Sequence, residues 1–239
     1  MKVRYDLHIH TALSPCGDDD MTPFNIANMA KLNGLDFIAV TDHNSCGNCE
    51  AVMKAGDEIG LTVIAGMELE TREEVHVVLL FPSLEKAKAC ETEVRAKMMP
   101  VKNRPDLFGE QLLMSETDEV IGREETLLVT ATDVGVYEAV ELAKRYDGIA
   151  FPAHIDRPSH GILEILGGIH SDMGFTTVEI SQAATDEFVN EWQKKGYTVV
   201  RSSDSHYLHT IASDENEIGN FLELDCVTAQ RVLSKLVKL

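Results

Sequence analysis

Short apolar runs alternate with segments of helical period along most of the chain. Apolar runs rich in Val and Ile, bounded by Gly, Asp or Asn, are typical of strands buried on both faces. The predicted strands lie at residues 1–10, 36–40, 61–65, 74–80, 148–151, 177–180, 197–200 and 221–224. The predicted helices lie at residues 23–33, 48–59, 83–98, 132–145, 185–195 and after 225. This alternation predicts parallel βα units, whose functional sites lie at the carboxyl ends of the strands.

Capping residues predict where several helices begin and end. Thr22-Pro23 favours a helix start and Asn33-Gly34 favours its stop. Either Thr132 or Asp133 is predicted to cap the fourth helix, and Asp225 to cap the closing helix. The stretch 99–125 contains prolines and glycines and has no sustained period. We therefore predict one barrel-sized domain over residues 1–239, with an insertion or lid at about 99–125.

Composition and charge narrow the class of function. The chain has 239 residues, 44% of them apolar, and a formal net charge of -19. This charge argues against binding of extended duplex nucleic acid, but divalent cations would locally invert its sign and admit a nucleotide or a strand end. The sequence contains no long apolar span and no secretory signal, so we expect a soluble, cytosolic protein without a membrane partner. The five cysteines are expected to be reduced thiols.

The first predicted strand ends in two histidines. Because side chains alternate along a strand, His8 and His10 are expected to project from one side, and Leu7 and Ile9 from the other. Two imidazoles on the same side of a strand can bind one metal ion. A lone His-x-His is weak evidence, since any half-buried strand also alternates polar and apolar residues.

Further residues of metal-ligand type follow later predicted strands. His43, Glu68 and His154 each come near the end of an apolar run, and His76 lies inside one, where a core histidine is the alternative. The motifs, in chain order, are Asp6-Leu7-His8-Ile9-His10-Thr11, Thr41-Asp42-His43, Gly66-Met67-Glu68, His76, Pro152-Ala153-His154 and Ser203-Asp204-Ser205-His206. Together they resemble the motifs of the polymerase-and-histidinol-phosphatase (PHP) family of metal-dependent phosphoesterases, over residues 5 to about 209. The resemblance implies an α/β fold, a distorted seven-stranded (β/α) barrel of the PHP type.

The resemblance also implies two or three divalent metal ions held at the strand ends. The implied ligands are His8, His10, Glu68 and Asp204 for the first ion, Glu68, His76 and His154 for the second, and His43, His206 and Asp18 for the third. The loop after His10 departs from the family pattern, in which an aspartate and a glycine follow closely. Asp18 is the best match by position, and Asp19 is the alternative. Imidazole and carboxylate ligands suit Zn, Mn and Fe(II).

The chemistry expected of such a site is hydrolysis of phosphate esters by a metal-activated water. The predicted catalytic residues are Asp204, His206 and Arg157. Arg157 would clamp the phosphate bidentately, or else form a surface salt bridge. Asp42 would either orient a ligand or cap a strand end.

Several other residues near the motifs have two interpretations. His160 and His209 would contact substrate or donate a proton to the leaving group, or else be ordinary histidines at the rim. Cys16, Cys46 and Cys49 would bind metal or respond to redox, or else pack as small apolar residues.

The resemblance favours the branch of the family that acts on nucleotides, nucleoside bisphosphates or the ends of short oligonucleotides. Within the same class, the alternative substrate is another phosphorylated small molecule, histidinol phosphate. From a different class, the alternative is a metal-binding module without catalysis.

Overall fold

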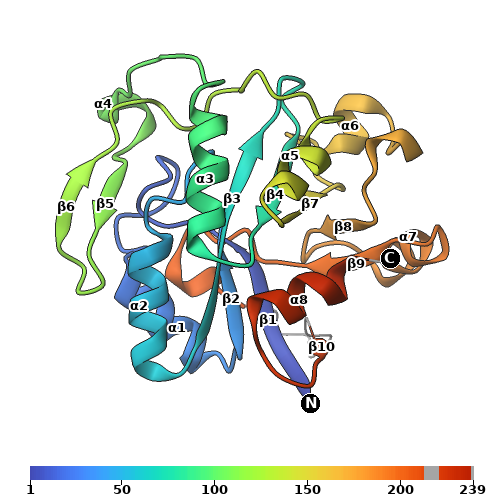
Figure 1. The fold of residues 1–239 in the computed structure, drawn as a ribbon, viewed down its shortest axis with the longest axis horizontal. Helices are drawn as coiled ribbons and strands as arrows, with labels where there is room; N and C mark the ends of the chain where they lie inside the picture. Colours follow the sequence, from blue (N-terminus) through green and yellow to red (C-terminus); the bar gives the residue numbers. More distant parts are fainter. Residues whose placement is uncertain (213–220, 238–239) are drawn as a thin grey trace.

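A computed structural model describes residues 1–212 and 221–237 (Figure 1). The strands are β1 Lys2–Ile9, β2 Phe37–Val40, β3 Thr62–Glu70, β4 His76–Leu80, β5 Leu112–Met114, β6 Val120–Arg123, β7 Ile149–Pro152, β8 Thr177–Ile180, β9 Thr198–Arg201 and β10 Phe221–Glu223. The helices are α1 Pro23–Leu32, α2 Cys49–Ile59, α3 Leu84–Arg95, α4 Pro105–Phe108, α5 Ala139–Arg145, α6 Ile162–Leu166, α7 Asp186–Lys194 and α8 Ala229–Leu236. No helix within these described ranges is long and apolar enough to cross a membrane.

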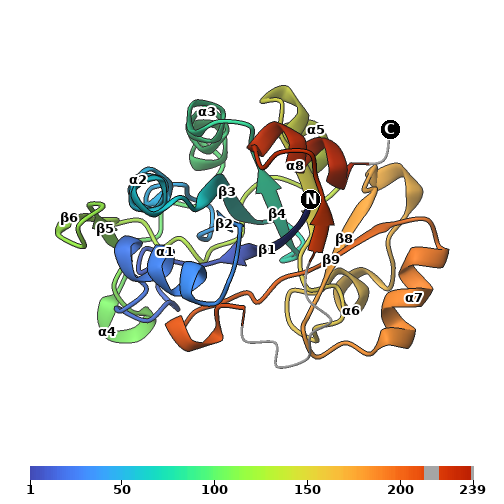
Figure 2. The same ribbon diagram turned by 90° about the horizontal axis from the view of Figure 1, so that it is seen from below.

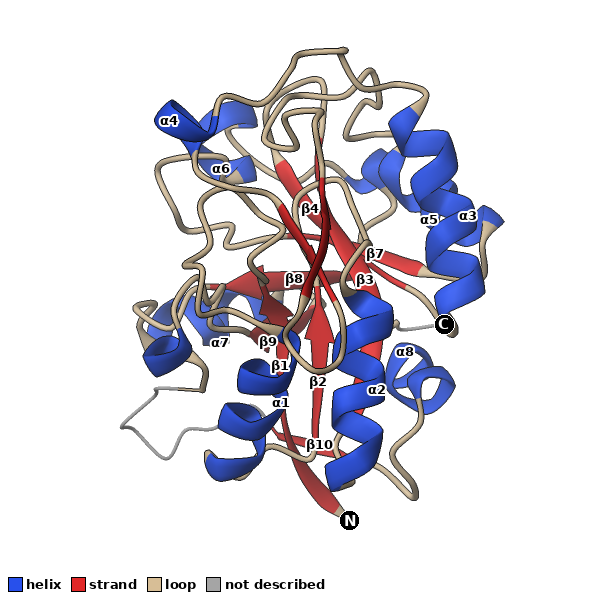
Figure 3. Ribbon diagram, turned by 90° about the vertical axis from the view of Figure 1, so that its left-hand side faces the viewer, coloured by secondary structure: helices blue, strands red, loops and turns tan. Residues whose placement is uncertain are grey.

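The main strands wrap around a common centre (Figures 1 and 3). One sheet has the order β10-β1-β2-β3-β4-β7, and β8 and β9 form a parallel pair beside β7. The N–H of Ile155 after β7 donates to the carbonyl of Glu179 in β8, and a parallel bridge joins Ile9 of β1 to Ser205 after β9. Strands β1, β2, β3, β4, β7, β8 and β9 therefore form a curled, incompletely bonded barrel, which confirms the predicted distorted barrel of the PHP type.

Strand β4 departs from the parallel pattern that the sequence predicts. It is antiparallel to β3, with Glu70 opposite His76, and antiparallel to β7 on its other side. The expectation of parallel units throughout is therefore wrong at this strand. The reversal brings the first residue of β4 to the edge where β3 and β7 end, so His76 joins the residues at the carboxyl ends of the other strands.

Two apolar cores lie on opposite faces of this curled sheet. The inner core includes Tyr5, Leu7 and Phe37, and residues of α8 close it from one end. The outer core packs α1, α2, α3 and α5 against the sheet and includes Ile9. Leu7 and Ile9 thus lie in different cores, against the expectation from strict alternation. The pairing of β1 with β2 shifts between Asp6 and Ile9, and such a bulge changes which face later side chains occupy.

Two helix starts differ from the prediction. Helix α5 begins at Ala139 rather than near Thr132, because the Thr132 hydroxyl donates to the carbonyl of Glu70 and forms a turn against β3. Helix α8 is capped by the Thr228 side chain, not by Asp225.

Residues 99–125 form α4 and the β5–β6 hairpin, at the opposite side of the molecule from α7 (Figures 1 and 2). The hairpin packs on the loop that follows β1. The N–H of Leu112 donates to the carbonyl of Ala12, and the hydroxyl of Thr22 donates to Asp118. Gly109 lies so close to Pro15 that an added Cβ would be 2.0 Å from the Pro15 carbonyl oxygen. This segment therefore fixes the loop after β1 in place.

Candidate metal centre

The side chain of Glu68, in β3, lies at the centre of a histidine cluster. Its carboxylate is 1% exposed, and ring nitrogens of five histidines lie 2.8–3.3 Å from its two oxygens. These histidines come from β1 and the residue that follows it, from the start of β4 and from the loops after β2 and β7: His8, His10, His43, His76 and His154. The structure thus brings together residues separated by more than half of the sequence.

Asp204 and His206 extend the cluster from the loop after β9. Asp204 Oδ1 lies 3.3 Å from His8 Nε2 and 3.0 Å from His10 Nε2. The His206 ring stacks on His10, with ring centroids 4.2 Å apart. Both Asp204 and His154 adopt positive φ, at 50° and 29°, which costs about 1–3 kcal/mol for a non-glycine residue. Such strain is typical of functional sites.

Charge interactions among the carboxylates and imidazoles of the cluster determine which of them are protonated. Burial alone would raise the pKa of Glu68, but His76, His8 and His43 hold it well below its usual value. Burial and the nearby His10 lower the pKa of His206 to about 3. The central carboxylate is therefore anionic and His206 is a neutral imidazole, which are the forms that bind cations.

The residues present fit divalent metal ions. Both Glu68 oxygens, Asp204 Oδ1 and His43 Nδ1 are buried without a hydrogen-bond partner of acceptable geometry. Burying anionic oxygens without partners is costly, unless cations bind there. Within residues 1–212 and 221–237, ligand atoms lie within 4.8 Å of one another in four groups: His8, His10, Glu68 and Asp204; His43, Glu68 and His76; His10, His43 and His206; and Glu70, His76 and His160. The first group coincides with the first predicted ligand set.

Two buried acids orient the first two histidines. Glu179 in β8 is 1% exposed, and its Oε1 accepts hydrogen bonds from His8 Nδ1 at 2.9 Å and from the His154 N–H at 3.1 Å. This arrangement directs His8 Nε2 toward the cluster. The sequence analysis missed Glu179, although an acid inside an apolar strand is a usable signal.

Asp42 acts on His10 through a serine. The Ser14 hydroxyl donates to Asp42 Oδ1 at 2.7 Å, and can therefore accept from His10 Nδ1 at 2.9 Å. Asp42 also accepts from the N–H and the hydroxyl of Thr11. This geometry favours the interpretation in which Asp42 orients a ligand.

The aspartate run does not join the cluster. Asp18 Oδ1 accepts from the N–H of Asp20 at 2.9 Å, and Asp18 belongs to none of the four groups found among the described residues. Asp19 is exposed. Cys16, from the same loop, instead places its sulfur 3.3 Å from His43 Nε2.

Arg157 lies at the opening of the centre. Its guanidinium pairs with Asp204, and it lines a cavity of about 130 Å³ together with Ser159 and His160. The His160 ring stacks on His76 at 4.2 Å between centroids. His209 is exposed, and its ring lies against that of Tyr207.

Cys46 and Cys49 are both buried, away from this cavity. The Cys46 thiol donates to Glu91, and the Cys49 thiol donates to the carbonyls of Val40 and Gly66. These contacts favour the interpretation in which both thiols pack in the protein interior.

A barrel with imidazoles and carboxylates that converge at one rim is typical of metal-dependent hydrolases. Residues 6–200 match the PHP domain, and the chain belongs to the PHP family. The chain therefore carries the domain of a family of metal-dependent phosphoesterases.

Individual relatives and solved structures agree with this family. Over 81 residues the chain is 30% identical to a 5'-3' exoribonuclease of Haemophilus influenzae, covering 33% of this chain and 28% of that protein. The fold resembles that of the lesion-specific endonuclease EndoQ of Pyrococcus furiosus, with a TM-score of 0.72 and 20% identity, over 99% of this chain and 56% of that one. It also resembles a protein designated a metal-dependent phosphoesterase from Bifidobacterium adolescentis, with a TM-score of 0.61 and 19% identity, over 98% and 97% of the two chains. The chain spans less than half the length of the curated relatives it matches.

Proposed function

We propose that this protein is a cytosolic phosphoesterase that hydrolyses a phosphate ester of a nucleotide, a nucleoside bisphosphate or a short oligonucleotide end. The observation that carries the proposal is the cluster around Glu68, with Arg157 at its opening. The proposed ligands are His8, His10, His43, Glu68, His76, His154, Asp204 and His206. The proposed cofactors are two or three ions of Zn, Mn or Fe(II).

When bound, the cations supply neutralising charge and a water of lowered pKa for attack on the ester. Residues of the chain position the substrate phosphate and the metal-binding histidines. Arg157 offers a planar fork of N–H donors that matches two phosphoryl oxygens. Glu179 and Ser14 hold His8 and His10 in fixed tautomers. The barrel wall excludes water from the buried side of the cluster, where His8 and His10 are fully buried.

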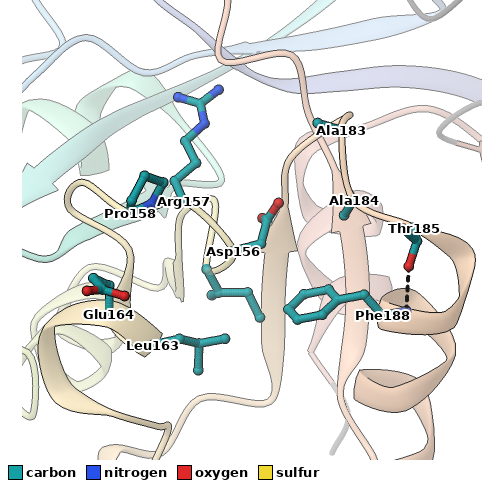
Figure 4. A pocket seen from close by; sticks show the side chains of 10 residues that line it. Asp156, Arg157, Pro158, Leu163, Glu164, Ala183, Ala184, Thr185 and Phe188 are labelled. Carbon is teal, nitrogen blue, oxygen red and sulfur yellow. Dashed lines mark hydrogen bonds between the residues drawn. The ribbon is translucent and has the colours of Figure 1, made fainter.

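A second cavity beside Arg157 supports an organic leaving group with a ring. It has a volume of about 470 Å³, within the range typical of ligand sites, and Arg157 lines both this cavity and the metal cavity. Figure 4 shows Leu163 and Phe188 facing each other across it, while the guanidinium of Arg157 points away from it. We infer that the nucleobase of a substrate whose phosphate lies at Arg157 occupies this cavity and contacts the Phe188 ring.

A substrate panel tests the proposal. Purified protein with added Mn²⁺, Zn²⁺ or Fe²⁺ is assayed on a nucleoside 3',5'-bisphosphate, short oligonucleotides, histidinol phosphate and glycerol phosphate. We expect the nucleoside substrates to have the highest kcat/KM. Phe188→Ala should raise KM for them about tenfold, since stacking of a base on an aromatic ring contributes about 1–3 kcal/mol, and leave KM for glycerol phosphate unchanged. Equal activity on every ester would contradict the substrate class, and full activity of the metal-free protein would contradict the mechanism.

Duplex DNA belongs in the same panel because of one structural neighbour. EndoQ has been solved with a 27-mer duplex that carries an abasic lesion at the active site. The net charge of -19 disfavours such a partner for this chain. Cleavage of an abasic duplex that persists at 0.2 M salt would replace the proposed strand-end substrate with a duplex one.

A further inference from the structure

We propose that Asp156 recognises the 2'-hydroxyl of the substrate's ribose, so that the protein prefers ribonucleotides to 2'-deoxyribonucleotides. The inference rests on the proposed function and names the sugar of its substrate. Asp156 lines the cavity of about 470 Å³ beside the metal centre and directly precedes Arg157 in the chain.

Asp156 occupies the part of the cavity where the sugar of a bound nucleotide would lie. In a nucleotide the ribose joins the phosphate to the base, and in the proposed site the phosphate lies at Arg157 and the base at Phe188. Asp156 lines the same cavity as both residues, and Figure 4 shows its side chain between theirs. Ala183 and Ala184 also line this cavity, and their methyl groups offer no hydrogen bond that could compete with the carboxylate.

Hydrogen bonds from Ser181 fix the Asp156 carboxylate. The Ser181 N–H donates to Oδ1 at 2.8 Å, and the Ser181 hydroxyl donates to Oδ2 at 2.5 Å. Asp156 follows β7 and Ser181 follows β8, so these bonds join two strands of the barrel. The N–H of Arg157 donates to the carbonyl of His154 at 2.9 Å and closes the turn that carries Asp156. A side chain held in this way loses little freedom when a ligand binds.

The fixed carboxylate selects for a hydroxyl donor. An ionised carboxylate only accepts hydrogen bonds, and each of its oxygens can accept two. Ser181 uses one lone pair on each Asp156 oxygen, which leaves one on each for a ligand. In a nucleoside 3',5'-bisphosphate the 5'- and 3'-oxygens both carry anionic phosphate, so the 2'-hydroxyl is the only donor on the sugar. This hydroxyl is the group that distinguishes ribose from deoxyribose.

The test compares adenosine 3',5'-bisphosphate with its 2'-deoxy analogue on the Mn²⁺-loaded protein. We expect the wild type to prefer the ribonucleotide about 10- to 100-fold in kcat/KM, as for a hydrogen bond to a charged acceptor. Asp156→Asn can keep both bonds to Ser181 but is neutral, and should reduce the preference to about 3- to 10-fold, because such bonds are about half as strong. Asp156→Ala should abolish it. The matched control is Glu164→Gln, which removes a charge from the same cavity and should leave the preference unchanged.

The ratio of the two kcat/KM values separates recognition from structural support, because loss of a structural contact would lower both by the same factor. Equal values in the wild type, or an unchanged preference in Asp156→Ala, would overturn the assignment and leave the proposed function standing. Hydrolysis of neither compound would instead contradict the proposed function. Calorimetric titration of the metal-loaded protein with each compound then tests Asp156 by itself: tighter binding of the ribonucleotide that is lost in Asp156→Ala supports the assignment, and equal affinities overturn it.

Discussion

Replacement of Glu179 by glutamine separates the charge of this acid from its hydrogen bonds. Both bonds, from His8 Nδ1 and from the His154 N–H, end on the same oxygen, Oε1. A glutamine with its oxygen in that place keeps both bonds and removes the negative charge, and it also buries an amide NH2 group. The other oxygen, Oε2, is buried without a partner, so the new amide group gains none.

We expect Glu179→Gln to weaken metal binding about tenfold and Glu179→Ala about 100-fold, the range found for residues that orient metal ligands. These factors correspond to about 1.4 and 2.7 kcal/mol. The loss should depend on pH. Burial opposes protonation of His8, but Glu179, Asp204 and Glu68 together hold its pKa well above the usual value. In the wild type a metal ion must displace a proton from His8. In Glu179→Gln the pKa of His8 is lower, so fewer molecules carry that proton. The difference in metal affinity between the two proteins should therefore shrink as pH falls.

The assay is competition with a chelator for Zn²⁺ at pH 6.5, 7.5 and 8.5, followed by kcat/KM at saturating metal. The matched control is Glu187→Gln, an exposed acid on α7 shortly after the strand that carries Glu179. Equal affinities for wild type and Glu179→Gln at every pH would refute the positioning role. A loss in Glu179→Gln that does not vary with pH would indicate a structural effect instead.

Three further predictions follow from the same geometry. Glu68→Ala should abolish ester hydrolysis and lower metal content while the far-ultraviolet circular dichroism stays unchanged; retained turnover would contradict the central role of this carboxylate. Arg157→Lys should lower kcat/KM about 100-fold without loss of metal, because lysine keeps the charge but loses the planar fork; a fall in metal content would instead make Arg157 a support of Asp204. For His206, whose folded-state pKa is about 3, only the unfolded chain takes up a proton below about pH 6.5. The metal-free wild type should therefore lose stability toward acid from this residue, and urea unfolding of His206→Asn should show a shallower decline; parallel declines would contradict this.

The apolar strands could be predicted because burial on both faces leaves an uninterrupted run, as in β2 at residues 37–40. The direction of β4 could not be predicted, because the same apolar run occurs in parallel and in antiparallel strands. The false start of α5 has a local cause: the Thr132 hydroxyl accepts from the N–H of Val134, as a cap does, but it also donates to the carbonyl of Glu70. Only the neighbouring strand distinguishes this turn from a helix start.

The candidate site was largely predictable where ligand-type residues follow strands and form motifs. Asp18 was chosen by counting along the loop, whereas the fold of that loop decides which side chain faces the cluster. Glu179 was missed because a single acid in a short strand also fits a strand with one exposed face. Its partner His8 is distant in the sequence, and only closure of the barrel brings the two together.

The length of the short turn between β3 and β4 determines how far His76 lies from Glu68. Thr71 and Val75 close it with backbone and hydroxyl hydrogen bonds, and Glu74 adopts a φ of 61°. A slip of one residue would exchange the two faces of β4, yet both faces are aliphatic and packed. We therefore expect an insertion in this turn to leave a folded protein in which His76 no longer lies beside Glu68.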